Sequence, residues 1–354
     1  MAIKIYPHSR NPIKMITKSS KTAISLTSYI SSKFSSQIPI IDLSTLHKSD
    51  PKSLHSLGQQ IDEANKRIGF FLIKNTGINF NFISQLLRTS QAFFESPLEN
   101  KLTCRNPDPD YLPWGYFPRN MEQLQRGKDF KNPKQDYLND VNEQFNLQSR
   151  HSESLVPIRQ FPPHPLEFKQ VFETYYQQAY ELSNLLMRGF AVALGVKPTF
   201  FEDKFTYGSS CLRVLHYPEG EKIAPGQFRA SEHTDYGALT LLYSTASGLQ
   251  VKNRKGEWVD IEVPWEHFVV NIGDLMAFWT DDRWVSNLHR VVAREETPKK
   301  RISVAFFHNP NHNALIECIP TCVDKNTGKG KYEKLFSGDF IMKKFKASVG
   351  EKDK

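Results

Sequence analysis

The feature that most constrains this chain is a succession of short β-rich runs that begins at residue 211. Turn signals such as Ser247-Gly248, Gly273-Asp274 and the stretch 253–256 separate several of these runs. Many short strands with frequent turns are typical of an antiparallel sandwich or jelly roll. The runs cover residues 211–217, 239–243, 249–251, 268–272, 275–279, 289–293, 301–308 and 315–319.

Helical spacing marks the first half of the chain. Apolar residues three or four apart predict helices over residues 51–68, 80–95 and 165–195. Apolar runs at 38–43, 69–73 and 143–147 predict strands, whereas most of 104–165 is rich in Pro, Asn and Asp and indicates loops. We therefore predict a mixed α+β protein with a jelly-roll core that is flanked by N-terminal helices.

Four regions follow from this pattern. Residues 1–37 are expected to form a basic, Ser-rich tail or targeting segment, and residues 331–354 a C-terminal tail. Between them we expect an N-terminal region with a loop-rich substrate segment over 38–165, and a helix followed by the jelly-roll catalytic core over 166–330.

The positive charge is concentrated in residues 1–41, called the leader below. Residues 1–41 contain six Lys or Arg and no Asp or Glu, so the net charge of +8 leaves only +2 for the other residues. A nearly neutral body argues against nucleic-acid binding, and no apolar run approaches the length of a membrane span. The four cysteines form no evident disulfide framework, which favours a reducing compartment. We expect a monomer in the cytoplasm, with import into a mitochondrion or plastid through the leader as the alternative.

Candidate metal ligands come from two distant stretches. In an extended segment, His233 and Asp235 of His233-Thr234-Asp235 would point to the same face. His289 follows 54 positions after Asp235, in another predicted strand. Two His and one carboxylate form the ligand set of non-haem Fe(II) oxygenases, but several divalent metals bind such a set. Spacing alone therefore does not name the metal.

A candidate anion site lies in the next predicted strand. Arg301 and Ser303 would share one face of that strand. A guanidinium beside a hydroxyl suits a terminal carboxylate, because Arg presents a planar fork of donors. Such a pair next to a metal could hold the far end of a dicarboxylate whose keto-acid end chelates the metal.

With these motifs, the sequence resembles the 2-oxoglutarate/Fe(II)-dependent dioxygenases of the isopenicillin N synthase-like family. The resemblance implies a double-stranded β-helix in which His233, Asp235 and His289 bind iron. It also implies that Arg301 and Ser303, with Tyr217 as a further contact, bind 2-oxoglutarate. The matching segments are 38–43, 69–77, 93–97, 212–218, 233–237, 248–251, 271–274, 288–291 and 301–303.

The expected function is an Fe(II)- and 2-oxoglutarate-dependent oxygenase of secondary metabolism that uses O₂ on a C–H bond of a small molecule. Hydroxylation, desaturation and oxidative cyclisation remain open. Two alternatives are an oxidase of the same fold that does not use 2-oxoglutarate and a non-catalytic jelly-roll binding protein. Candidate substrate contacts are Arg213, Tyr116, Phe117 and Arg119. The two arginines suggest an anionic, amino-acid-like substrate.

Overall fold

The computed structural model describes residues 38–46, 50–106, 114–119, 121–128, 140–148, 160–206, 209–218, 227–293 and 300–349. The expected tail or targeting segment at 1–37 lies outside these residues, as do parts of the loop-rich stretch 104–165 and residues 350–354.

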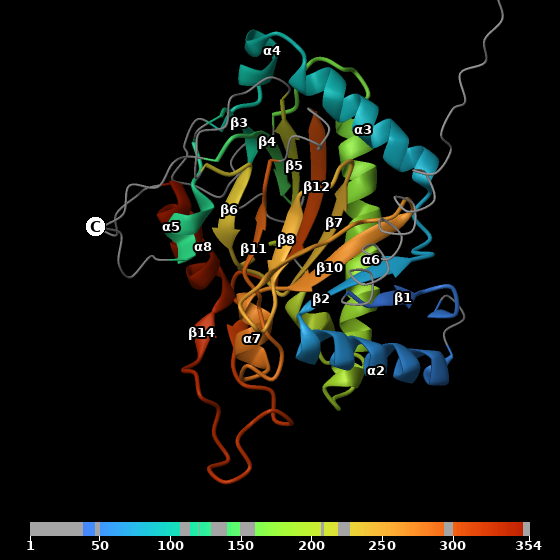
Figure 1. Ribbon diagram of the computed structural model, residues 1–354, viewed down its shortest axis with the longest axis vertical. Helices are drawn as coiled ribbons and strands as arrows, with labels where there is room; N and C mark the ends of the chain where they lie inside the picture. Colours follow the sequence, from blue (N-terminus) through green and yellow to red (C-terminus); the bar gives the residue numbers. More distant parts are fainter. Residues whose placement is uncertain are drawn as a thin grey trace, which may run out of the picture. The chain divides into compact units, whose positions relative to one another are not determined.

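A large sheet and a small sheet form the β core (Figure 1). Only β1 and β2 pair in parallel in the described sheets, and the other pairs are antiparallel. The large sheet has the order β1 (Ile40–Asp42), β2 (Phe70–Lys74), β10 (His267–Ile272), β7 (Leu239–Ser244), β12 (Arg301–His308), β5 (Cys211–Tyr217), β4 (Glu143–Gln148) and β3 (Gly115–Phe117). The small sheet has the order β6 (Ala230–His233), β11 (His289–Val291), β8 (Leu249–Lys252) and β9 (Trp258–Asp260). A hairpin pairs β13 (Leu315–Ile316) with β14 (Leu335–Phe336). This architecture is the predicted jelly roll.

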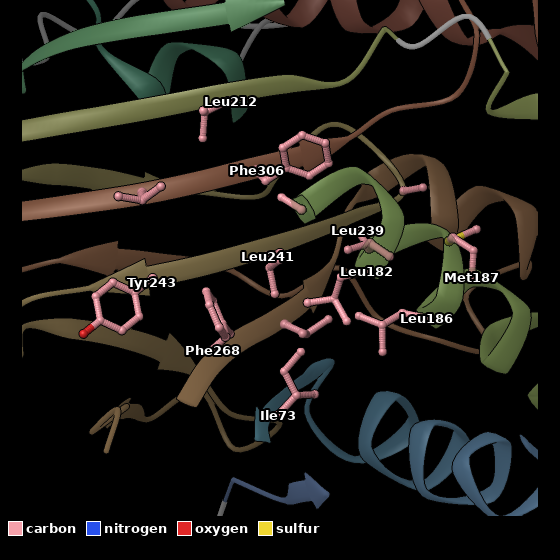
Figure 2. Close-up of a cluster of buried hydrophobic side chains, with 14 of the residues drawn as sticks. Ile73, Leu182, Leu186, Met187, Leu212, Leu239, Leu241, Tyr243, Phe268 and Phe306 are labelled. Atoms are coloured by element: carbon pink, nitrogen blue, oxygen red, sulfur yellow. The ribbon is translucent and has the colours of Figure 1, made fainter. Parts of the chain in front are cut away.

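Helices cover the face of the large sheet that is turned away from the small sheet. The long helix α6 (Phe168–Ala193) packs on β7 and β12, and α2 (Pro51–Arg67) and α3 (Phe80–Phe94) pack against α6. Figure 2 shows the resulting core, in which Leu182 and Leu186 of α6 meet Leu241 and Phe306 of the sheet. The remaining helices are α4 (Leu98–Leu102), α5 (Leu124–Lys128), the 3₁₀ turn η3 (Glu202–Lys204), α7 (Asp274–Trp279) and α8 (Ser337–Val349).

Side-chain alternation divides β12 and β5 between two environments. Ile302, Val304 and Phe306 point into the helix-covered core, as the period of two in a strand requires. The intervening Arg301 and Ser303 line a cavity on the side of the small sheet. The same alternation in β5 sends its odd-numbered residues to the cavity, so one strand pair supplies both a core and a binding surface.

Residues 275–279 and the expected C-terminal tail are among the segments that differ from the expectation. Residues 275–279, predicted as a strand, form α7, because the main-chain N–H groups of Asp274 and Leu275 donate to the carbonyls of Asp235 and Tyr236 and begin a helical turn. Short apolar runs do not distinguish a strand from a buried helix by periodicity. The expected C-terminal tail also contains an ordered helix, α8, whose Phe345 is buried.

Candidate metal centre

His233, Asp235 and His289 converge on one point. Their possible ligand atoms all lie within 4.8 Å of one another. His289 pairs directly with His233 across β11 and β6, and the two ring centroids are 4.2 Å apart. Asp235 follows β6, and its Oδ1 lies 3.8 Å from His233 Nε2 and 3.5 Å from His289 Nε2. The register of two neighbouring strands therefore assembles the group.

Hydrogen bonds orient each of the three side chains. His233 Nδ1 lies 2.6 Å from the Ser231 carbonyl, and His289 Nδ1 lies 3.2 Å from the Asn287 carbonyl. Donation from Nδ1 leaves each Nε2 free to bind a metal. The Oδ2 atom of Asp235 accepts hydrogen bonds from Thr240 Oγ1 and Asn271 Nδ2, so its Oδ1 faces the histidines.

The electrostatics of His233 and Asp235 suit a cation. Burial lowers the pKa of His289, but the charge of Asp235 outweighs burial and raises it. Burial, with the charge of His289 next, lowers the pKa of His233 to about 3. Burial raises the pKa of Asp235, but the two histidines outweigh it and hold this pKa well below its usual range. A neutral imidazole and an ionised carboxylate are the forms that bind metals.

Arg301 and Ser303 provide unsatisfied donors in the same cavity. Arg301 is only 1% exposed, and its Nη1 and Nη2 atoms have no hydrogen-bond partner among the described residues. The hydroxyl of Ser303 is likewise buried and unpaired within the described part of the chain. Buried unpaired donors are costly, so this pair indicates an anionic ligand that satisfies them.

Tyr217 lies directly opposite Arg301 in the β5–β12 pair. The guanidinium carbon of Arg301 is 5.0 Å from the centre of the Tyr217 ring. Both residues and all three candidate ligands line one cavity of about 140 Å³. A dicarboxylate bound to Arg301 could thus extend toward the candidate metal ligands.

Arg213 also lines this cavity, but its charge is not free. Its Nη1 lies 2.9 Å from Glu122 Oε2, and its Nε donates to Asn146 Oδ1 at 3.1 Å. Burial lowers the pKa of Arg213, but Glu122 outweighs burial and raises it. Because Glu122 compensates the guanidinium, Arg213 gives no support for an anionic substrate.

The three other substrate candidates are not among the described residues that line the cavity. Tyr116 is a core residue whose hydroxyl donates to Glu143 at 2.6 Å, and Phe117 is also buried in β3. Arg119 is exposed. Pairing of β3 with β4 at the sheet edge places Tyr116 and Phe117 in the core and not in the cavity lining.

Several residues that line the cavity, or that contact its lining, were not found from the sequence. Glu122 belongs to the loop-rich segment, where no pattern linked it to Arg213. Ile341, Met342 and Phe345 of α8 form part of the cavity wall. The helical spacing of the apolar residues between 340 and 349 was the signal that could have identified this helix.

Family comparisons agree with this geometry. Residues 208–310 match the model of the 2OG-Fe(II) oxygenase superfamily, and residues 38–164 match that of the non-haem dioxygenase in morphine synthesis N-terminal region. Homoarginine-6-hydroxylase 2-ODD-233 of Oryza sativa subsp. japonica is 32% identical, over 87% of this chain and 96% of the relative. The 2-oxoglutarate-Fe(II) type oxidoreductase hxnY of Emericella nidulans is 29% identical, over 88% and 90%.

Solved structures of 2-oxoglutarate-binding proteins are also similar to this chain. A full-length Neurospora crassa protein, crystallised in complex with alpha-KG and thymine, is 32% identical and has a TM-score of 0.76, with 88% of this chain and 96% of that chain covered. JOX2 in complex with 2OG, Fe and JA is 27% identical with a TM-score of 0.68, over 85% and 83%.

Proposed function

Since this chain belongs to the 2OG-Fe(II) oxygenase superfamily, we propose that His233, Asp235 and His289 hold its Fe(II). Arg301, Ser303 and Tyr217 hold the 2-oxoglutarate in the same proposal. The protein is an Fe(II)- and 2-oxoglutarate-dependent dioxygenase that acts with O₂ on small molecules. Neither an oxidase without 2-oxoglutarate nor a non-catalytic binding protein is favoured by these relatives.

One observation carries the proposal: the unpaired donors of Arg301 and Ser303 line the same cavity as the three candidate ligands. A buried guanidinium fork and a hydroxyl fit the distal carboxylate of 2-oxoglutarate. Two imidazoles and a carboxylate fit Fe(II) and leave coordination positions for further ligands. The residues present therefore fit both groups.

Bound Fe(II) and 2-oxoglutarate supply the oxidising chemistry that breaks a substrate C–H bond with O₂. The chain itself positions the reactants. Arg301 and Ser303 fix one end of the cosubstrate, and hydrogen bonds from Thr240 and Asn271 hold the Asp235 carboxylate. Since the cavity is shared, the substrate binds beside the metal, and its placement selects the C–H bond that reacts.

Loss of a visible charge-transfer band tests the ligand assignment. Anaerobic addition of Fe(II) and 2-oxoglutarate should give a weak band in the wild type and none in His233→Ala. His267→Ala is the matched control, because His267 begins β10, contacts the carbonyl of Trp265 and is not among the described residues that line the cavity. A His233→Ala variant that retains the band would exclude this assignment.

The partners and the compartment are also part of the proposal. We propose a monomer that engages neither nucleic acid nor membrane, and the nearly neutral charge of residues 42–354 argues against nucleic-acid binding. No helix in the described ranges combines the length and apolar character needed to cross a membrane. Size-exclusion chromatography with light scattering tests the oligomeric state. A fluorescent fusion of residues 1–41 distinguishes cytoplasmic location from import into a mitochondrion or plastid.

A further inference from the structure

The cavity has two functional ends along the β5–β12 pair. Tyr217 and Arg301 face each other at one end, and Arg213 pairs with Ala305 four residues farther along. Four residues of strand correspond to about 13 Å. The end at Arg301 is assigned above to 2-oxoglutarate, which leaves the end at Arg213 for the substrate.

Arg213 offers a donor to that end. Its Nε and Nη1 atoms are bonded to Asn146 and Glu122, and no described residue accepts from Nη2. The residue is buried and lines the cavity, so a ligand in the cavity can reach this donor. A ligand that presents a hydrogen-bond acceptor to Nη2 would satisfy it.

Glu122 cancels the charge of Arg213 and is itself held in place. Its carboxylate accepts from Arg213 Nη1 at 2.9 Å, from Gln144 Nε2 at 3.1 Å and from Ser348 Oγ at 3.3 Å. These contacts come from β5, β4 and α8. The pair is therefore a fixed neutral unit that presents a donor.

The formal charges of the other lining side chains, of Fe(II) and of 2-oxoglutarate also sum to zero. The positive charge of Arg301 cancels that of Asp235, and the charges of Fe(II) and doubly ionised 2-oxoglutarate cancel each other. Arg229, whose guanidinium carbon lies 5.9 Å from the Tyr217 ring, adds a buried positive charge behind the 2-oxoglutarate end and not at the Arg213 end. Asp235 is the one acidic side chain among the described lining residues, and the metal uses it. An additional cation or anion at the Arg213 end would lack a counter-charge, and a buried unpaired charge is strongly unfavourable.

The wall near Arg213 combines apolar side chains with polar ones, which include Gln148 and Tyr236. Ile341, Met342 and Phe345 project from α8, and the Phe307 ring centre lies 5.5 Å from the guanidinium carbon of Arg213. An aromatic ring beside a guanidinium and three apolar side chains suits a ligand with a largely apolar or flat body.

From these charges and contacts we infer that the substrate is a small uncharged molecule that has an apolar or flat body and gives a carbonyl-type acceptor to Arg213. The inference rests on the proposed function. It favours substrates of the class of thymine, found in the Neurospora crassa complex, over homoarginine, which carries a guanidinium and has net positive charge.

Equilibrium binding to the full-length protein tests this inference. The protein is first loaded anaerobically with Fe(II) and 2-oxoglutarate, and the visible band confirms loading. Absence of the band would count against the proposed function, whereas the substrate inference is judged only on protein that shows it. The loaded protein is then titrated with thymine, with homoarginine and with matched pairs of an amide and a carboxylate, such as nicotinamide and nicotinate. The change in the visible band measures binding of each compound.

Uncharged members should bind at least about tenfold more tightly than their carboxylate partners and homoarginine. Glu122→Gln leaves Arg213 with an uncompensated charge and should shift the ratio toward carboxylates by about tenfold. The control Glu317→Gln removes an exposed carboxylate paired with Lys334 and should leave the ratio unchanged. Arg213→Gln should weaken uncharged ligands by about tenfold without an accompanying gain for carboxylates.

Three results would overturn the inference. They are tighter wild-type binding of homoarginine or of the carboxylates, binding of no uncharged compound in the panel, and a ratio that does not respond to Glu122→Gln. If Glu122→Gln fails to fold, the wild-type ratios and Arg213→Gln still decide the result.

Discussion

Lys344 of α8 and Asp274 of α7 form an ion pair with 3.0 Å between Nζ and Oδ2, and both side chains are largely buried. Asp274 Oδ2 also accepts from the hydroxyl of Thr234, which stands between the candidate ligands His233 and Asp235. Helix α8 is thus joined by two polar contacts to the segment 233–235, which contains two of the candidate metal ligands.

Breaking this ion pair should destabilise the protein. Lys344→Met keeps the aliphatic stem but leaves the Asp274 carboxylate buried without its cation. We expect the free energy of unfolding to fall by about 3 kcal/mol, together with faster proteolysis within α8. Denaturant titration and limited proteolysis measure both effects. Lys343→Met is the control on the exposed side of the helix; equal losses in the two variants would contradict the role of the pair.

The hydrogen bond from Thr240 should tune metal affinity. Thr240→Val preserves the shape of the side chain but removes a donor to Asp235 Oδ2, so the carboxylate is less well oriented. The dissociation constant for Fe(II) or Co(II) should rise by about tenfold. Metal titration measures this change. Thr103→Val, at an exposed turn, should leave metal binding at the wild-type value, and an unchanged constant in Thr240→Val would argue against the prediction.

The cosubstrate anchor should depend on the shape of the guanidinium as well as its charge. Arg301→Lys retains a cation but loses the planar fork, and Ser303→Ala removes the neighbouring hydroxyl. Each change should raise the dissociation constant for 2-oxoglutarate by at least about tenfold while Fe(II) binding persists. Isothermal calorimetry measures both ligands. Arg188→Lys, an exposed residue of α6, is the control, and wild-type affinity in Arg301→Lys would refute the anchor.

Acid stability should depend on Glu143. Burial raises the pKa of this carboxyl, but hydrogen bonds from His216, Tyr116 and Lys101 outweigh burial and lower the pKa from 4.5 to about 2. A folded-state pKa below the unfolded value means that the carboxylate stabilises the fold above the unfolded pKa. This contribution is lost as the pH falls from 4.5 toward about 2.

Glu143→Gln should therefore be less stable than the wild type at neutral pH and should show a shallower loss of stability over that acidic range. Unfolding in denaturant at a series of pH values measures the slope. Glu181→Gln, on an exposed part of α6, should keep the wild-type slope. Parallel pH curves for wild type and Glu143→Gln would show that this cluster does not control acid stability.

Strand parity explains how far the sequence could predict the site. His233, Asp235, His289, Arg301 and Ser303 carry the family pattern and lie in or beside strands, where period-two alternation assigns a common face. The cavity then brings them together. The candidate metal ligands and the candidate cosubstrate anchor could therefore be predicted from the sequence alone.

The Arg213 end of the cavity, proposed for the substrate, could not be predicted from the sequence in the same way. Arg213 has the strand parity of Tyr217, so its approach to the cavity could be anticipated, but its counter-charge could not. Glu122 lies 91 positions away in a segment without periodicity. Pairing of this kind depends on tertiary packing, and sequence spacing carries no information about it.

The direct pairing of His289 with His233 has a consequence for folding. A slip of one residue between β11 and β6 would turn one imidazole to the opposite face of the small sheet. In such a chain Val291, which shares the face of His289, would also leave its buried position, and the candidate metal site would not form. Iron retention would then distinguish molecules that have the correct strand register from molecules in which the register is shifted.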